Sequence, residues 1–143
     1  MPEVTVTARS PSADSATPSS HRPSQPVARL VPAVPAIHVA VDDADKAVHV
    51  ISALLVHLSE LLALSASSPF WRGEPTGLSS SRQMVFAAFP RSGPPPRFRD
   101  YADYAEVVGQ LERTGCIADY THIWWDIRPH PRLGTIEIRI CDA

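Results

Sequence analysis

The sequence lacks several features that would point to familiar classes of protein. It has only two cysteines, Cys116 and Cys141, in 143 residues, which excludes a disulfide framework. Its 13 lysines and arginines nearly balance its 15 aspartates and glutamates, so no basic surplus favours a nucleic-acid partner. The N-terminus has no charged start followed by an apolar run, as a signal peptide would. These shortages lead us to expect a soluble, cytoplasmic protein.

An uninterrupted apolar run is also missing. The longest apolar stretch, from Val48 to Leu64, is broken by His49, Ser52, His57, Ser59 and Glu60. A stretch this polar is not expected to cross a bilayer, so we expect no membrane partner. With 143 residues, the chain is at most one ordinary domain.

Proline is the residue in excess. The chain has 15 prolines, about twice the usual share, and they concentrate in residues 1–35 and 94–96. Residues 1–35 are rich in serine, alanine and arginine and contain no glycine or aromatic residue. Because such a segment buries too little apolar area to offset its ordering entropy, we expect a disordered tail, with Val4–Thr7 as its one candidate strand. Two alternatives are a tail that is not native coding sequence and a polyproline ligand for another protein.

The predicted ordered domain spans residues 36–143. Alternating apolar residues predict a strand over residues 36–41, followed by Asp42 and Asp43 as helix caps. Apolar residues three and four apart then predict a helix of about twenty residues. The remaining predicted elements are a loop (67–81), a short helix (80–89), a proline-rich linker (90–98), a helix between Asp100 and Gly115, and two strands (123–128 and 135–141) that form an antiparallel hairpin.

Strand alternation predicts how the side chains of this hairpin divide. Its isoleucines would lie on one face under the helices. Five polar residues would share the opposite face: His38, Asp126, Arg128, Glu137 and Arg139. This pattern has two interpretations, a solvated face with cross-strand ion pairs, or a floor that binds anionic ligands and a divalent metal.

Five short motifs resemble a known family. Segment 63–73 reads Ala-Leu-Ser-Ala-Ser-Ser-Pro-Phe-Trp-Arg-Gly, and Thr76, Gly77 and Arg82 follow it. Pro-Arg-Ser-Gly-Pro-Pro at 90–95, Trp-Asp-Ile-Arg-Pro at 125–129 and Thr-Ile-Glu-Ile-Arg-Ile-Cys-Asp-Ala at 135–143 come in the same order. Over residues 36–143 the chain resembles the bacterial carboxylate–amine ligases of the glutamate–cysteine ligase type 2 family.

The resemblance implies a fold and an activity. The expected fold is α+β, a partial glutamine-synthetase-like antiparallel sheet backed by helices. The implied reaction joins the side-chain carboxylate of glutamate to cysteine or another amine through an acyl phosphate, with ATP and Mg²⁺ as cofactors.

The resemblance also implies roles for individual residues. Arg128 and Arg139 would act in catalysis by holding phosphate or carboxylate. Glu137 and His38 would be metal ligands. Substrate would be bound by Arg72, Thr76, Gly77 and Arg82.

The chain also departs from the family pattern. One imidazole of a His-x-His pair is replaced by Ala36, and Pro75 stands where many relatives have aspartate. Relatives begin with a glutamate-rich strand and continue beyond the segment that ends at Ala143. We therefore also consider an inactive, truncated remnant of such a ligase, in which an open sheet edge favours self-association.

Overall fold

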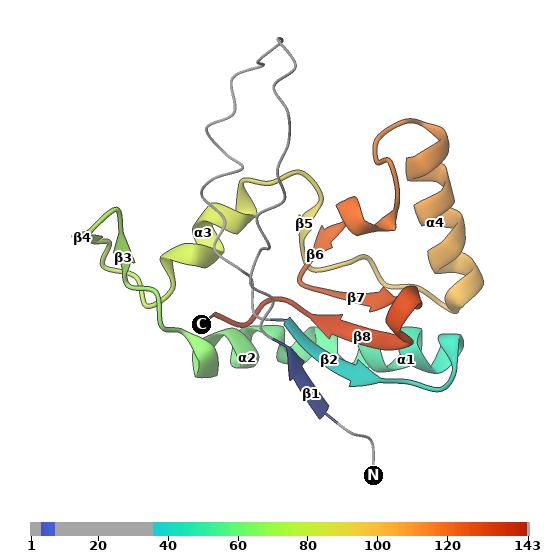
Figure 1. The fold of residues 1–143 in the computed structure, drawn as a ribbon, viewed down its shortest axis with the longest axis horizontal. Coiled ribbons are helices and arrows are strands. Elements are labelled where there is room, and N and C mark those ends of the chain that lie inside the picture. The colour runs from blue at the N-terminus through green and yellow to red at the C-terminus, as the bar shows by residue number, and fades with distance from the viewer. Residues whose placement is uncertain (1–3, 8–35, 143) are drawn as a thin grey trace, which may run out of the picture.

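A computed structural model describes residues 4–7 and 36–142, which form an α+β fold (Figure 1). The strands are β1 (Val4–Thr7), β2 (Ala36–Ala40), β3 (Phe70–Trp71), β4 (Glu74–Pro75), β5 (Ser92–Gly93), β6 (Trp124–Trp125), β7 (Ile127–His130) and β8 (Thr135–Ile138). The helices are α1 (Ala44–Leu54), α2 (Leu58–Ser65), α3 (Ser81–Ala87) and α4 (Tyr101–Arg113). Three 3₁₀ turns complete them: η1 (Leu55–His57), η2 (Tyr120–His122) and η3 (Pro131–Leu133). Apart from β1, the expected disordered tail lies outside the described residues.

The largest sheet has four strands in the order β1-β2-β8-β7, and each strand is antiparallel to its neighbour. The predicted hairpin is confirmed as β7 and β8, joined by η3 and by Gly134, whose φ of 60° suits glycine. Its first strand is shorter than predicted, because β6 leaves this sheet and pairs in parallel with β5. The break falls at Asp126, whose carbonyl accepts hydrogen bonds from Arg139 N and Ile140 N.

One face of this sheet is covered by a helical run that confirms the predicted long helix. The Asp43 side chain caps α1 by accepting from Lys46 N at 2.8 Å. Ala47, Ile51 and Leu58 pack against the isoleucines of β7 and β8, and Figure 1 shows α1 and α2 along that face. Burial of this apolar face is the main source of stability for the helix.

The same helical run also passes a simple test for membrane spans. By length and composition, Ala44–Ser65 is apolar enough to cross a bilayer, so the expectation that it is too polar is wrong on those criteria. Core helices of soluble proteins pass the same test, and this run packs on the sheet.

A second core joins α1 to α4. Tyr104 and Val108 of α4 pack with Val48, Ile123 and Trp125. As predicted, Asp100 caps α4, and the helix ends just before Gly115, whose φ is 70°. Burial raises the pKa of Tyr104 to about 12, so its phenol stays neutral in this core.

Strands β3 and β4 form a small hairpin within the segment that was predicted to be a loop. Arg72 and Gly73 link the two strands with φ of 53° and 87°, the positive values that a type I′ turn requires. The prediction of a loop without strands over residues 67–81 is therefore wrong at this hairpin. Helix α3 follows as predicted, with Ser80 as its cap.

Candidate functional site

Three of the predicted site residues lie in one row across the large sheet. The register pairs His38 of β2 with Glu137 of β8, and Glu137 with Arg128 of β7. Directly paired residues project to the same face of a sheet, so this part of the predicted charged face is confirmed. His130 and Thr135 form the next row on the same face, and His38 Nδ1 lies 2.9 Å from Thr135 Oγ1.

This charged face is buried, so the interpretation as a solvated surface is wrong. The side chains of Arg128, Glu137 and Arg139 are only 7%, 11% and 10% exposed. Arg128 Nε donates to Glu137 Oε2 at 2.7 Å. Charges this deeply buried are costly unless they are paired, so removing either partner of this ion pair would destabilise the fold.

Arg128 is largely committed to holding the fold together. Its Nη1 atom donates to the carbonyls of Tyr120, Thr121 and Ile123 at 3.0, 3.1 and 2.6 Å. These bonds attach η2 and the residue after it to the sheet. With Nε bound to Glu137 as well, Arg128 has few donors left for a phosphate or carboxylate ligand.

Arg139 is the better candidate for binding an anion. Its Nε lies 3.8 Å from Glu137 Oε1, beyond hydrogen-bonding distance, and has no hydrogen-bond partner within the described part of the chain. The guanidinium lies over the Trp124 ring, 5.0 Å from its centroid. Burial lowers the pKa of Arg139, and the nearby Glu137 carboxylate opposes that shift. A buried guanidinium with an open donor suits a carboxylate or phosphate.

Asp126 was predicted to lie on the charged face, but it does not join the row. It lies between β6 and β7, outside every strand, because the break in the predicted strand falls there. It is 7% exposed, and burial raises the pKa of its carboxyl group against the opposing effects of Gln83, Arg139 and Arg82.

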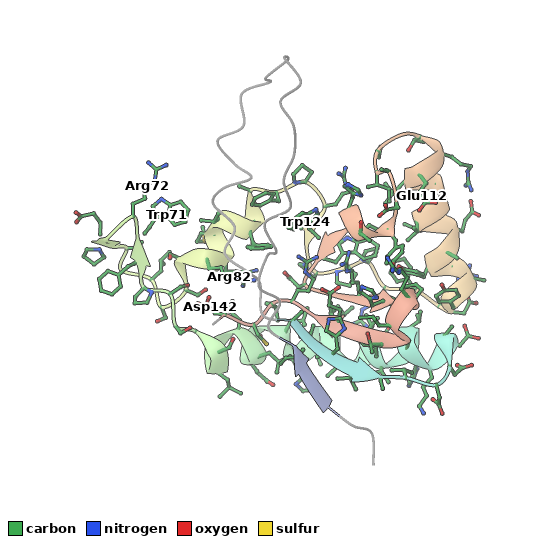
Figure 2. All side chains as sticks on the ribbon, viewed as in Figure 1. Trp71, Arg72, Arg82, Glu112, Trp124 and Asp142 are labelled. Atoms are coloured by element: carbon green, nitrogen blue, oxygen red, sulfur yellow. The ribbon has the colours of Figure 1, made fainter. Side chains whose placement is uncertain are left out.

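The predicted substrate residues form a second group, apart from Glu137. Arg72 and Gly77 are exposed. Thr76 Oγ1 donates to Pro69 O at 2.8 Å and accepts from Leu78 N, so it closes the base of the hairpin. Figure 2 shows Arg72 at the outer end of this hairpin, with Arg82 between it and the large sheet.

Arg82 is the predicted substrate residue that reaches the sheet. Its Nη1 donates to Cys141 O at 3.0 Å, and its guanidinium lies 4.5 Å from the centroid of the Phe86 ring. It is 8% exposed, and burial lowers its pKa while Asp142 opposes that shift. Asp142 was not among the predicted site residues. It belongs to the last motif, but no periodic pattern marks it, since its partners lie more than seventy residues away.

The described residues do not make a complete metal site. They contain no cluster of three or more histidine, cysteine, aspartate or glutamate side chains that could hold a metal ion. Glu137 and His38 would supply two ligands, and one oxygen of Glu137 already accepts from Arg128. Mg²⁺ takes oxygen ligands in octahedral geometry, whereas these two residues offer one carboxylate that Arg128 already binds and one imidazole, so they do not fit the ion by themselves.

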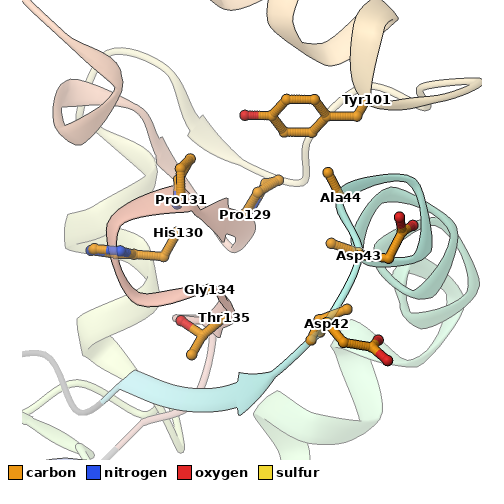
Figure 3. A pocket seen from close by; sticks show the side chains of 11 residues that line it. Asp42, Asp43, Ala44, Tyr101, Pro129, His130, Pro131, Gly134 and Thr135 are labelled. Carbon is orange, nitrogen blue, oxygen red and sulfur yellow. The ribbon is translucent and has the colours of Figure 1, made fainter.

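A cavity of about 280 Å³ lies beside the site, at the end of the sheet (Figure 3). Its walls include Ala44, Tyr101, Pro129 and Gly134. None of the predicted site residues lines it. His130 and Thr135, which form the second row of the charged face, also line it, together with Asp42 and Asp43.

Comparison with known proteins identifies the family. The model of glutamate–cysteine ligase family 2 matches residues 24–143, a range that includes part of the expected tail. A candidate glutamate–cysteine ligase 2-3 of Rubrobacter xylanophilus is 51% identical over 107 residues, covering 75% of this chain and 30% of that protein. Candidate glutamate–cysteine ligases 2 of Thermobifida fusca and Bdellovibrio bacteriovorus are 50% and 46% identical, again over 75% of this chain and 27% and 28% of their own lengths.

This chain thus spans less than a third of the length of these relatives. The family match contains the β3–β4 hairpin, α3 and the three strands that carry the charged face, β2, β7 and β8. Since the match covers most of the chain, the protein belongs to glutamate–cysteine ligase family 2.

Proposed function

We propose that this chain is part of an ATP-dependent ligase that joins the side-chain carboxylate of glutamate to the amine of cysteine. The observation that carries the proposal is Arg139, a buried guanidinium with an open donor beside Glu137, in a chain of this ligase family. The names of the relatives support glutamate and cysteine as substrates.

In the proposed reaction the glutamate carboxylate takes the terminal phosphoryl group of ATP and becomes an acyl phosphate, and ADP leaves. The amine then attacks the acyl carbon, and phosphate leaves. Both steps place negative charge on oxygens, and a fixed guanidinium stabilises such charge. Arg139 would hold these oxygens, and Glu137 would keep its neighbouring guanidinium groups oriented.

ATP and Mg²⁺ belong to this proposal as the cofactors. The two candidate ligands, Glu137 and His38, include only one carboxylate, and Arg128 already binds one of its oxygens, so they suit Mg²⁺ poorly. We therefore expect the 143-residue chain by itself to form no measurable γ-glutamylcysteine from glutamate, cysteine, ATP and Mg²⁺. Product formation by the purified chain would show that these residues are sufficient.

A chimera tests the function without relying on the isolated chain. The segment of the Rubrobacter xylanophilus relative that matches this chain is replaced by residues 36–142, and dipeptide formation is measured together with phosphate release. We expect an active chimera, and a loss of activity of at least about a hundredfold with Arg139→Ala, as for other groups that stabilise transition-state charge.

Arg113→Ala is the matched control, because Arg113 pairs with Glu106 at an exposed position. This variant should keep full activity. A folded but inactive chimera, beside an active unmodified relative, would contradict the proposal. Replacing cysteine with other amines in the same assay identifies the preferred acceptor.

A further inference from the structure

Asp142 connects segments that are far apart in the sequence. Its Oδ2 atom accepts hydrogen bonds from Ser67 N and Ser68 N, both at 3.0 Å, and from Ser68 Oγ at 2.6 Å. The residue is 4% exposed. Three donors on one carboxylate oxygen, shielded from water, hold Ser67 and Ser68 firmly in place.

Arg82 and Ser65 complete this connection. Ser68 Oγ accepts from Arg82 N at 3.2 Å, and Ser65 Oγ accepts from Asp142 N at 2.9 Å. The end of α2, the start of α3 and the segment after β8 therefore meet at Asp142. Figure 2 shows Arg82 and Asp142 side by side, between Trp71 of the hairpin and the large sheet.

The base of the β3–β4 hairpin rests on this junction. Ser68 O accepts from Ser81 N and from Ser81 Oγ, both at 2.7 Å, and Ser68 forms a bridge with Ser80. Both ends of the segment that carries Arg72, Thr76 and Gly77 are thereby attached to Ser68. On its other side, Asp142 follows Arg139 by only three residues.

The second oxygen of Asp142 indicates a role beyond folding. Oδ1 is buried and has no hydrogen-bond partner among the described residues, and the same is true of Arg82 Nε. Unpartnered buried polar atoms cost free energy, so these two atoms do not add to the stability that the Oδ2 bonds provide.

We propose that Asp142 is a positioning residue that sets the distance and orientation between the β3–β4 hairpin and the Glu137–Arg139 site. Its hydrogen bonds to Ser67 and Ser68 let one amino-acid substrate contact the hairpin and Arg139 at the same time. The identity of that substrate as glutamate rests on the proposed function. The positioning role itself rests on the contacts of Asp142.

Amide hydrogen exchange on the full chain, read by nuclear magnetic resonance, tests the positioning role. In Asp142→Asn and in Ser68→Ala, the amides of Ser67, Thr76 and Ser81 should exchange about tenfold faster, since each variant weakens bonds worth about 1 kcal/mol or more. Amides that pair β7 with β8 should keep their wild-type rates. Ser68→Thr retains the hydroxyl and should restore slow exchange.

Asp119→Asn is the matched control. Its carboxylate also caps a backbone N–H, that of Thr121 at 2.7 Å, but at an exposed site and within two residues. The hairpin amides should not change in this variant. Unchanged hairpin exchange in both Asp142→Asn and Ser68→Ala, or equal acceleration in the β7–β8 pair, would overturn the positioning role.

A titration with L-glutamate separates this role from the proposed function. In the wild type, the amide signals of the hairpin and of Arg139 should shift together with one binding constant. In Asp142→Asn the hairpin signals should no longer follow those of Arg139. If glutamate moves neither group in the wild type, these residues do not bind glutamate by themselves, while the exchange rates still decide the positioning role.

Discussion

The two groups of candidate residues differ in how they are held. The charged face of the large sheet is buried and held by ion pairs, with Glu137 between Arg128 and Arg139. The β3–β4 hairpin is exposed, and its own strands contribute only two residues each. The sheet face thus has one rigid arrangement, whereas the position of the hairpin depends on contacts at its base. Rigid groups suit charge stabilisation, and adjustable ones suit the admission of substrates.

Breaking the buried charge network should have the largest effect on stability. Glu137→Ala leaves Arg128 and Arg139 without their carboxylate partner, and we expect the free energy of unfolding to fall by about 3–5 kcal/mol. Chemical denaturation measures this loss. Glu106→Ala is the control, because its pair with Arg113 is exposed and should contribute at most about 1 kcal/mol. Equal losses in the two variants would show that the sheet face is no more constrained than the surface.

Lowering the pH should distinguish two buried carboxyl groups, Asp142 and Asp126, by their effect on the free energy of unfolding. Burial alone would raise the pKa of Asp142, but hydrogen bonds from Ser68 and Ser67, together with the Arg82 charge, outweigh it and lower the pKa. A lowered pKa in the folded state stabilises the protein above the unfolded pKa of about 4, and this stability is lost as the pH falls through the folded pKa.

In Asp142→Asn, the free energy of unfolding should therefore fall less steeply at the acid end of a series from pH 7 to pH 2. Asp126→Asn is the contrasting variant, because burial raises the pKa of Asp126 and its charge opposes folding at neutral pH. That substitution should not flatten the acid limb. The opposite pattern would show that Asp142 is not held as a carboxylate by its donors.

A change in the hairpin turn should have a smaller, local effect. Gly73 has a φ of 87°, which side chains rarely adopt, although a Cβ there would meet no atom within 4 Å. Gly73→Ala should therefore cost about 1 kcal/mol through backbone strain alone. Faster exchange confined to the hairpin amides is the expected result. A loss of sheet protection in this variant would contradict the independence of the two regions.

The smallest effect on folding is expected from Arg72→Ala. Its exposed side chain makes no hydrogen bond within the described part of the chain. The free energy of unfolding should therefore change by no more than about 0.5 kcal/mol. Any loss of glutamate affinity would then reflect substrate contact alone. Arg132→Ala, at another exposed arginine, is the control for the change in net charge.

The elements that could be predicted from sequence are those specified locally. Asp43 and Asp100 were recognisable as caps because a cap bonds a backbone N–H within three residues. The row of His38, Glu137 and Arg128 followed from alternation along regular strands. Alternation failed at Asp126, where the strand leaves one sheet for another, and no local signal marks such a break.

What the sequence determined by itself was the set of helices, the main hairpin and the division of their side chains between an apolar and a charged face. These depend on periodicity, caps and turn residues, which act over a few positions. Only the tertiary structure decided that the charged face is buried, that Arg128 binds backbone carbonyls of η2, and that Asp142 holds Ser67 and Ser68. These contacts join residues from separate elements, so their energies depend on how the elements pack. A local sequence pattern does not predict that packing.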